Sequence, residues 1–214
     1  DKKFGIKSFV IYNPLNKSSI IKKSKERINL KFFKKNNLKL LTIGRLVDQK
    51  DHDTLLRSIN LLKNEKIQLL IIGNGSNKDK LERYILEKNL ISKVKIIPFQ
   101  NNPHKYLKIA DIFLFTSKFE GLPNVLLEAQ TLKKYIISTK CPTGPNEILL
   151  NGKAGDLIKI GDYKKMAEKI KYYINNKKKL KNKIKVGFKN LNRFDYNYNM
   201  KQYSKIISKF IYFW

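Results

Sequence analysis

The sequence has little cysteine, few acidic residues and no long apolar run. Its one cysteine, Cys141, excludes an intramolecular disulfide and is typical of a reducing compartment. No apolar run reaches the ~18 residues that a membrane-spanning helix needs, and no signal peptide is present at the start. We therefore expect a cytoplasmic protein, with peripheral attachment to the membrane left open. Because residue 1 is Asp rather than Met, we expect the chain to begin partway through a longer protein.

Recognisable metal ligands are also lacking. The sequence contains no His/Cys cluster, so we expect no metal and no cofactor. The two histidines, His52 and His104, fall in predicted helices without a visible partner. We expect His52 to open its helix, His104 to be exposed, and neither to be catalytic.

Acidic residues are scarce beside basic ones. There are 17 Asp and Glu against 46 Lys and Arg, which gives a net charge of +29. Such a charge attracts nucleic acid, anionic membranes or phosphorylated ligands, although a general bias toward Lys, Asn and Ile would also produce it. No helix-turn-helix, zinc finger, RNA-binding strand or aromatic-interleaved basic patch is present. We expect no specific nucleic-acid partner, but a basic nucleic-acid-binding protein remains an alternative.

Short apolar segments alternate with helical patterns along the chain. This alternation predicts an α/β protein with a doubly wound parallel sheet, Rossmann-like, and the hydrophobic content of 42% suffices for its core. Ligands in this architecture bind outside the carboxyl ends of the strands. The predicted strands are 39–44, 67–73, 94–98, 111–115 and 135–139.

Two cations follow the first predicted strand. Gly44 allows a sharp turn and a close approach by a ligand, while Arg45 and Lys50 bracket the loop before a helix that begins near Asp51. Cations beside a helix N-terminus can bind a diphosphate. In a chain this basic, two cations in one loop can equally be incidental.

Two glutamates follow the fourth predicted strand. Glu120 lies in a tight loop, and Pro123 suits the first turn of the helix that follows. Asn124 and Glu128 share one face of that helix. Free backbone N–H groups there can bind an anion, and a carboxylate can hold sugar hydroxyls. The alternative is a capped surface helix with two solvated glutamates.

The run Glu-Gly-Leu-Pro-Asn-Val-Leu-Leu-Glu-Ala, from Glu120 to Ala129, resembles the Glu-x7-Glu motif of retaining GT-B glycosyltransferases of the group 1, family 4 type. Gly-Arg-Leu followed by Gln-Lys-Asp-His is similar to the donor-phosphate loop of that family. The run Pro-Thr-Gly-Pro-x-Glu-Ile-Leu at 142–149 resembles members that act on lipid-linked or surface glycans. The resemblance covers about residues 9–176 and the tail only loosely.

The resemblance implies residue roles in binding a nucleotide-diphosphate sugar. It implies that Arg45 and Lys50 contact the diphosphate, that Glu120 lies beside the donor sugar and that Glu128 binds the ribose hydroxyls. It also places Phe99 against the nucleobase. We therefore expect Arg45, Lys50 and Glu120 to be catalytic. The expected donor-binding residues are Gly44, Phe99, Gly121, Leu122, Pro123, Asn124, Val125 and Glu128.

The resemblance also implies a domain organisation, that of the C-terminal half of a GT-B fold. We expect 1–36 to be a linker and remnant with a short strand at 9–14, 37–176 to bind the nucleotide sugar, and 177–214 to form a helical tail. The apolar stripe of the tail would pack on the core or on another domain, or lie on an anionic membrane surface.

The expected activity is transfer of a sugar, with retention, to a glycan or polyprenyl-linked acceptor. In the family the acceptor site belongs to an N-terminal domain, so we expect this chain to be incomplete without that domain. A non-catalytic sugar-nucleotide-binding module is a further alternative.

Overall fold

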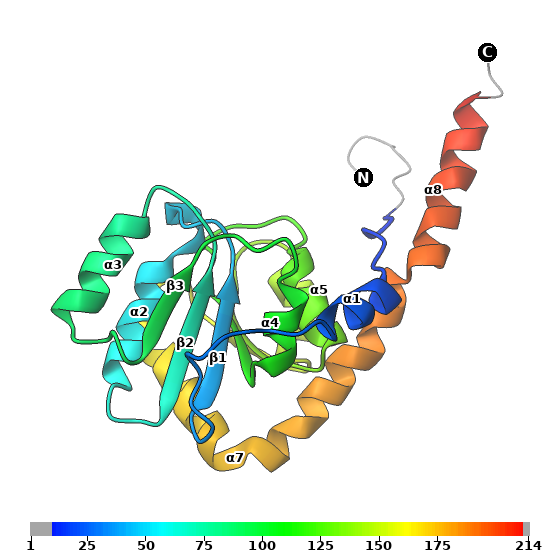
Figure 1. The fold of residues 1–214 in the computed structure, drawn as a ribbon. Helices are drawn as coiled ribbons and strands as arrows, with labels where there is room; N and C mark the ends of the chain where they lie inside the picture. Colours follow the sequence, from blue (N-terminus) through cyan, green and yellow to red (C-terminus); the bar gives the residue numbers. More distant parts are fainter. Residues whose placement is uncertain (1–9, 212–214) are drawn as a thin grey trace.

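All strands of the sheet in the described part of the chain run parallel. The computed structural model describes residues 10–211, and its sheet has six strands in the order β3-β2-β1-β4-β5-β6 (Figure 1). The prediction of a doubly wound parallel sheet is confirmed. The strand order reverses between β1 and β4, which is where such sheets bind ligands. The strands are β1 Leu38–Ile43, β2 Ile67–Ile72, β3 Val94–Ile97, β4 Ile112–Phe115, β5 Tyr135–Thr139 and β6 Asp156–Ile158.

Helices cover both faces of the sheet, and β2, β4 and β5 are therefore buried at every residue. The α-helices are α1 Lys17–Ser24, α2 His52–Leu61, α3 Lys78–Glu87, α4 His104–Ile109, α5 Asn124–Thr131, α6 Pro145–Ile148, α7 Tyr163–Asn190 and α8 Tyr196–Ile211. The 3₁₀ helices are η1 Asp48–Lys50, η2 Leu150–Gly152 and η3 Leu191–Phe194.

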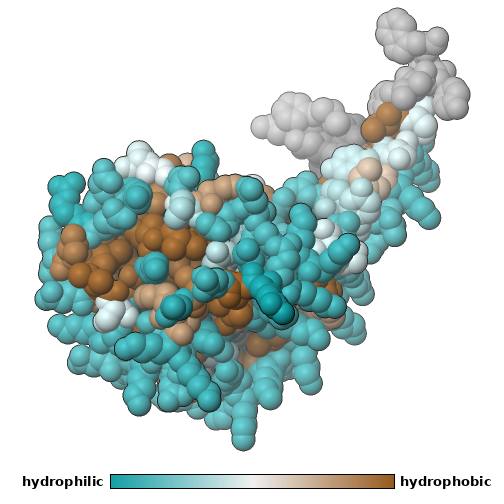
Figure 2. Space-filling model, viewed as in Figure 1, coloured by the Kyte–Doolittle hydropathy of each residue, from teal (hydrophilic) through white to brown (hydrophobic). Residues whose placement is uncertain are grey.

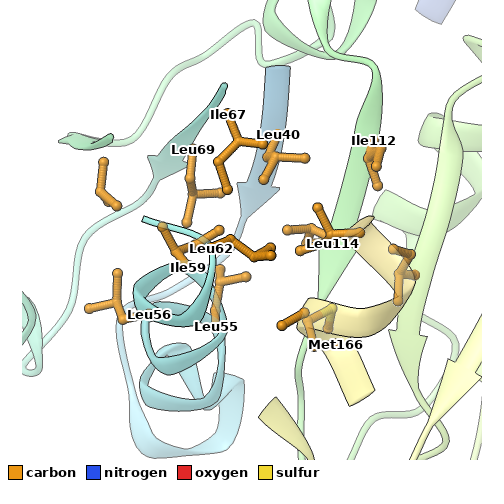
Figure 3. Packing of buried hydrophobic residues seen from close by; sticks show 14 of the residues in the cluster. Leu40, Leu55, Leu56, Ile59, Leu62, Ile67, Leu69, Ile112, Leu114 and Met166 are labelled. Carbon is orange, nitrogen blue, oxygen red and sulfur yellow. The ribbon is translucent and has the colours of Figure 1, made fainter. Parts of the chain in front are cut away.

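One face of the sheet packs against α2, α3 and the first half of α7. Leu55 and Ile59 of α2 point toward Leu40 of β1, and Met166 of α7 closes the same core below Leu114 (Figure 3). All five side chains are fully buried. This packing fixes where α2 begins, and hence where the loop after β1 lies.

The other face packs against α1, α4 and α5. Leu126 and Leu127 of α5 and Leu107 of α4 join a second core cluster around Phe113 of β4. Ile20 anchors α1 on this face, where α1 contacts α4 and α5. The second cluster therefore fixes the first turns of α4 and α5 at one edge of the sheet.

The N-terminal segment differs from the prediction. Residues 10–14 form no strand, and Phe9 lies outside the described residues. The segment instead lies beside η3 and α8: the N–H of Leu15 donates to the carbonyl of Phe194 at 2.8 Å, and the N–H of Tyr12 donates to Asn199 Oδ1 at 3.2 Å. A strand needs a neighbouring ladder, and this segment reaches only one isolated bridge, from Leu15 to Asp195.

Side chains also join these two segments, in part through Glu147 of α6, which both segments contact. The Tyr12 hydroxyl donates to Glu147 Oε1, and Arg193 Nη2 donates to the carbonyl of Glu147 at 3.1 Å. The rings of Tyr12 and Phe194 pack in a tilted arrangement, with their centroids 4.8 Å apart and their planes at 56°. We call these contacts, together with the backbone bonds of Leu15, the terminal clasp.

The C-terminal region is helical, as predicted. α7 runs through residue 176 as one helix with a kink at Asn176 (φ −129°, ψ 23°), and α8 projects away from the sheet (Figure 1). Tyr203 and Ile207 of the expected apolar stripe are 36% and 53% exposed. The stripe is therefore not part of the core formed by residues 10–211. The expected continuation at Phe213 and Trp214 lies outside the described residues.

Polar and charged side chains cover most of the visible surface, with an apolar area on the side of α3 and β3 (Figure 2). No helix within residues 10–211 is both long and apolar enough to cross a membrane.

Candidate functional site

The loop after β1 brings Lys50 to the carboxyl edge of the sheet. The loop runs through η1 and ends at Asp51, whose left-handed backbone (φ 46°) and side chain cap the N-terminus of α2. The stem of Lys50 lies over Gly44, since a Cβ added to Gly44 would be 3.5 Å from Lys50 Cε. Gly73 of the next loop leaves room for the carbonyl of Gly44, which a side chain at Gly73 would strike. Gly75, two residues later, lies equally close to the carbonyl of Leu46, so both glycines of this loop serve its packing on the loop after β1.

Lys50 and Glu120 form an ion pair across the switch point. Lys50 Nζ lies 2.5 Å from Glu120 Oε1, and the two side chains are only 18% and 11% exposed. The ring of Phe115 lies beneath the ammonium, with its centroid at 5.5 Å. The loops after β1 and β4, predicted to converge from the parallel-sheet rule, thus meet in direct contact.

Several hydrogen bonds hold these two loops in register. Thr116 Oγ1 donates to the carbonyl of Lys50 at 2.8 Å, and Gln49 Nε2 donates to the carbonyl of Phe119 at 2.9 Å. The carbonyl of Gln49 accepts from the N–H of Lys118 at 2.8 Å. Arg45 is exposed, and its Nη2 lies 3.4 Å from Gln49 Oε1. The sequence reasoning missed Gln49, although it stands inside the Gln-Lys-Asp-His run.

The loop after β5 supports the loop that carries Glu120. Thr143 Oγ1 donates to the carbonyl of Glu120. Gly144 (φ 81°) packs on the carbonyl of Gly121 so closely that a side chain would not fit. Gly121 itself faces open space. The backbone beside Glu120 is thus supported on one side by the loop after β5, and at Gly121 it faces open space.

Pro123 differs from its prediction. It is the N-cap of α5 with an extended backbone (φ −73°, ψ 99°), not a residue of the first turn. Leu122 and Val125 are half-buried against the core of this face. Their side chains anchor the start of α5, while Asn124 is exposed.

Asn124 and Glu128 share one face of α5, as predicted, and line a pocket of about 180 Å³. His104 of α4 lines it with them, its Nε2 3.6 Å from Glu128 Oε2. The expectation that His104 is exposed is wrong, since its side chain is 12% exposed and lies against Glu128. No local sequence signal could have shown this contact, because it joins two helices that separate strands bring together. Lys50 and Glu120 do not line this pocket.

Phe99 lies in the loop after β3, as predicted, and is 65% exposed. Its N–H donates to Asn74 Oδ1 at 3.2 Å, which ties the loop after β3 to the loop after β2. An aromatic ring held open at this edge can stack on a planar ligand.

His52 opens α2, as predicted, and is buried beside the site. Burial, and then the nearby charge of Lys50, lower the pKa of His52 from 6.5 to about 4. Its imidazole is therefore neutral at pH 7 and adds no charge to the loop.

The arrangement places a paired cation and carboxylate at the switch point, an exposed guanidinium beside them and a second carboxylate in a polar pocket nearby. Such groups can bind an anion and the hydroxyls attached to it. Among residues 10–211, no three His, Cys, Asp or Glu side chains are grouped so as to hold a metal ion. A larger pocket of about 670 Å³ lies at the amino end of β1, lined by Leu38, Asp111 and Tyr173 among others, away from these groups.

Comparison with models of protein families shows to which family the chain belongs. The model of the family described as "Glycosyl transferases group 1" matches residues 23–190. The chain belongs to this glycosyltransferase family. The resemblance carried by Glu120, Glu128 and the loop after β1 is thus confirmed at the level of the family.

Among curated proteins, this group 1 glycosyltransferase chain is 33% identical over 183 residues to N-acetylgalactosamine-N,N'-diacetylbacillosaminyl-diphospho-undecaprenol 4-alpha-N-acetylgalactosaminyltransferase of Campylobacter jejuni. That alignment covers 84% of this chain and 48% of that protein. The chain is also 30% identical to the capsular polysaccharide biosynthesis glycosyltransferase CapH of Staphylococcus aureus, over 96% of this chain and 55% of CapH. The glycosyltransferase chain thus spans about half the length of these two relatives.

Among solved structures, Anabaena HepE in complex with UDP and glucose superposes with a TM-score of 0.81 at 21% identity. The match covers 94% of this chain and 56% of HepE. The fold of this glycosyltransferase chain is therefore that of the Rossmann-like C-terminal domain of GT-B enzymes. The roles of the individual site residues remain predictions.

Proposed function

We propose that this chain is the donor-binding half of a retaining glycosyltransferase, which transfers a sugar from a nucleotide diphosphate to a glycan or a lipid-linked acceptor. The observation that carries the proposal is the contact of Lys50 with Glu120 at the switch point of the sheet. It brings the predicted phosphate-binding loop and the first glutamate of the Glu-x7-Glu motif into one site.

In this proposal, Lys50 and Arg45 bind the diphosphate. When the bond from the sugar to the diphosphate breaks, negative charge builds on the leaving phosphate and positive charge on the sugar ring. Cations already held in a shielded site stabilise the leaving group without reorganising. Lys50 meets this condition because its stem lies over Gly44 and its ammonium is largely buried. Arg45, which is exposed, would fold onto the diphosphate when the ligand arrives.

The two glutamates take different parts of the donor. Glu120 lies beside Lys50 and hence beside the sugar end of the diphosphate, where its carboxylate can accept hydrogen bonds from sugar hydroxyls. Glu128 holds the ribose in the pocket on α5, and Phe99 lies against the base. This division agrees with the separation of the two carboxylates, of which only Glu128 lines the pocket with His104.

The acceptor class is inferred from relatives. The Campylobacter relative is named for transfer onto a diphospho-undecaprenol-linked sugar, and CapH for capsular polysaccharide biosynthesis. Since this chain covers about half of each, we propose that an N-terminal domain completes the acceptor site. With that domain present, an α-linked donor should yield an α-linked product by NMR, and a β-linked first product would exclude retention.

Isothermal titration calorimetry with UDP, GDP and ADP tests donor binding. We expect one of these nucleotides to bind, and the double variant Arg45→Ala/Lys50→Met to lose that binding while its circular dichroism stays unchanged. The matched control is Arg83→Ala/Lys88→Ala, which removes the same charge from two exposed positions, one on α3 and one at its C-cap. Unaltered affinity in the first variant, or equal loss in both, would remove the assignment of the phosphate loop.

A second titration tests Glu128. Glu128→Gln should weaken UDP far more than it weakens pyrophosphate, because pyrophosphate carries no ribose. Equal losses for the two ligands would count against the assignment.

A further inference from the structure

The pocket on α5 is built from three parts of the chain. Asn13 and Asn16 of the N-terminal segment form one wall, His104 of α4 forms the second, and Asn124 and Glu128 of α5 form the third. Its volume of about 180 Å³ suits a small polar group rather than a whole nucleotide. Its polar side chains thus come from α4, from α5 and from the segment at 13–16, and Ser19 of α1 adds a further hydroxyl.

His104 has unused hydrogen-bonding capacity in this pocket. Both its ring nitrogens are buried, and neither has a hydrogen-bond partner among the described residues. An imidazole always carries at least one N–H, and a buried donor without a partner is unfavourable. The 3.6 Å from Nε2 to Glu128 Oε2 is too long for a hydrogen bond. It is short enough, however, for one oxygen atom to lie about 2.8 Å from both atoms.

We propose that His104 and Glu128 hold the same ribose hydroxyl, and that His104 thereby selects ribonucleotides over the deoxyribonucleotide lacking that hydroxyl. This inference rests on the proposed function, in which Glu128 binds ribose. The hydroxyl donates its proton to the carboxylate and accepts the N–H of the imidazole. A hydroxyl can make both bonds at once, whereas a methylene in the same place makes neither.

The expected discrimination against the deoxynucleotide can be estimated from the buried groups that it leaves without a hydrogen-bond partner. A site built to hydrogen-bond a hydroxyl rejects the analogue that lacks it, because its buried donor and acceptor then stay unpaired. For two buried partners we expect about 30-fold discrimination against that deoxy analogue. Glu128 alone would still favour the ligand that carries the hydroxyl. Replacing His104 should therefore remove only part of the discrimination against the deoxy analogue.

The alternative is that His104 merely supports Glu128 through its bulk or its charge. In that case a variant of His104 would weaken every nucleotide that reaches the pocket by a similar factor. A shared hydroxyl has a different consequence, since the effect of the variant disappears once the hydroxyl is gone.

Titration calorimetry with UDP, 2′-deoxy-UDP, 3′-deoxy-UDP and pyrophosphate separates these cases, with the GDP series used in parallel. The variants are His104→Phe, which keeps a planar ring without hydrogen-bonding atoms, and His104→Gln, which restores a donor. We expect His104→Phe to weaken UDP about tenfold. It should leave pyrophosphate and one of the two deoxy analogues unchanged, and His104→Gln should recover part of the UDP affinity.

The outcomes are distinct. If His104→Phe weakens UDP and both deoxy analogues by the same factor, or changes none of them, the inference is overturned while the proposed function stands. If none of UDP, GDP and ADP binds the unaltered chain, the proposed function fails and the inference fails with it.

Discussion

The ion pair between Lys50 and Glu120 should compete with a bound diphosphate. In the ligand-free structure, the ammonium of Lys50 is held by the carboxylate of Glu120 at 2.5 Å. A diphosphate that takes the lysine must weaken this bond. Glu120→Gln should therefore tighten the binding of free UDP, although the same change should slow sugar transfer.

The magnitude follows from how shielded the pair is. A hydrogen bond to a charged group contributes about 1.5–3 kcal/mol in a protein. With both side chains less than one-fifth exposed, little of this is screened by water. The amide introduced by Glu120→Gln would still accept a weaker hydrogen bond from Lys50. We therefore expect UDP binding to gain only part of the free energy of the charged hydrogen bond. A gain of about 1.4 kcal/mol corresponds to about tenfold tighter binding.

Calorimetry with UDP and with UDP-glucose or UDP-N-acetylglucosamine measures the effect. In the intact nucleotide sugars, the sugar hydroxyls would give Glu120 a new partner, so Glu120→Gln should help them less than it helps UDP. The control is the same change in a Lys50→Met background, where no lysine remains to be released. There the gain should largely vanish.

Two results would refute this reasoning. Glu120→Gln could leave UDP affinity unchanged or lower, which would show that Lys50 serves the carboxylate and the phosphate at once. Alternatively, the gain could be the same in the Lys50→Met background, which would show simple repulsion between the carboxylate and the phosphate.

Three further predictions concern stability. The folded state keeps His52 neutral down to a pKa of about 4 while the unfolded chain binds a proton near pH 6.5, so the unfolding free energy falls as the pH drops through this window. Between pH 7 and pH 4.5, His52→Asn should reduce this fall in the unfolding free energy by about 2 kcal/mol, as measured by urea unfolding. If the variant loses as much stability as the unaltered chain, His52 is not the cause of the fall. Leu55→Ala should cost about 2–5 kcal/mol, whereas Leu61→Ala, on the exposed side of α2, should stay within about 0.5 kcal/mol; similar losses would contradict the packing. Tyr12→Phe should cost less than about 1 kcal/mol overall but speed hydrogen exchange at the Leu15 N–H, and unaltered exchange there would mean that the hydroxyl does not hold the segment.

The strands of the sheet were predictable where burial is complete. β2 and β4 are buried at every residue, and their nearly continuous apolar runs are typical of parallel strands. β6 was missed because it has three residues, one of them half-buried, and depends on pairing with β5. α1 was missed because a lysine-rich helix held mainly by Ile20 shows no amphipathic pattern.

The candidate site was predictable only in part, for a geometric reason. The parallel-sheet rule brings the loops after β1 and β4 to one edge, and they do meet there. Which side chains then pair depends on rotamers and loop packing, which a sequence pattern does not encode. The pairing of Lys50 with Glu120 and the approach of His104 to Glu128 are both of this kind.

The terminal clasp has a mechanical consequence. Because the segment at Tyr12–Leu15 and the segment at 193–199 are bonded side by side, a pulling force applied to the two flanks of the domain loads these bonds before it loads the sheet. In a single-molecule pulling experiment, the first rupture should release the short flanking segments at low force. The six strands, and the cleft along their edge, would stay intact until a second, larger event.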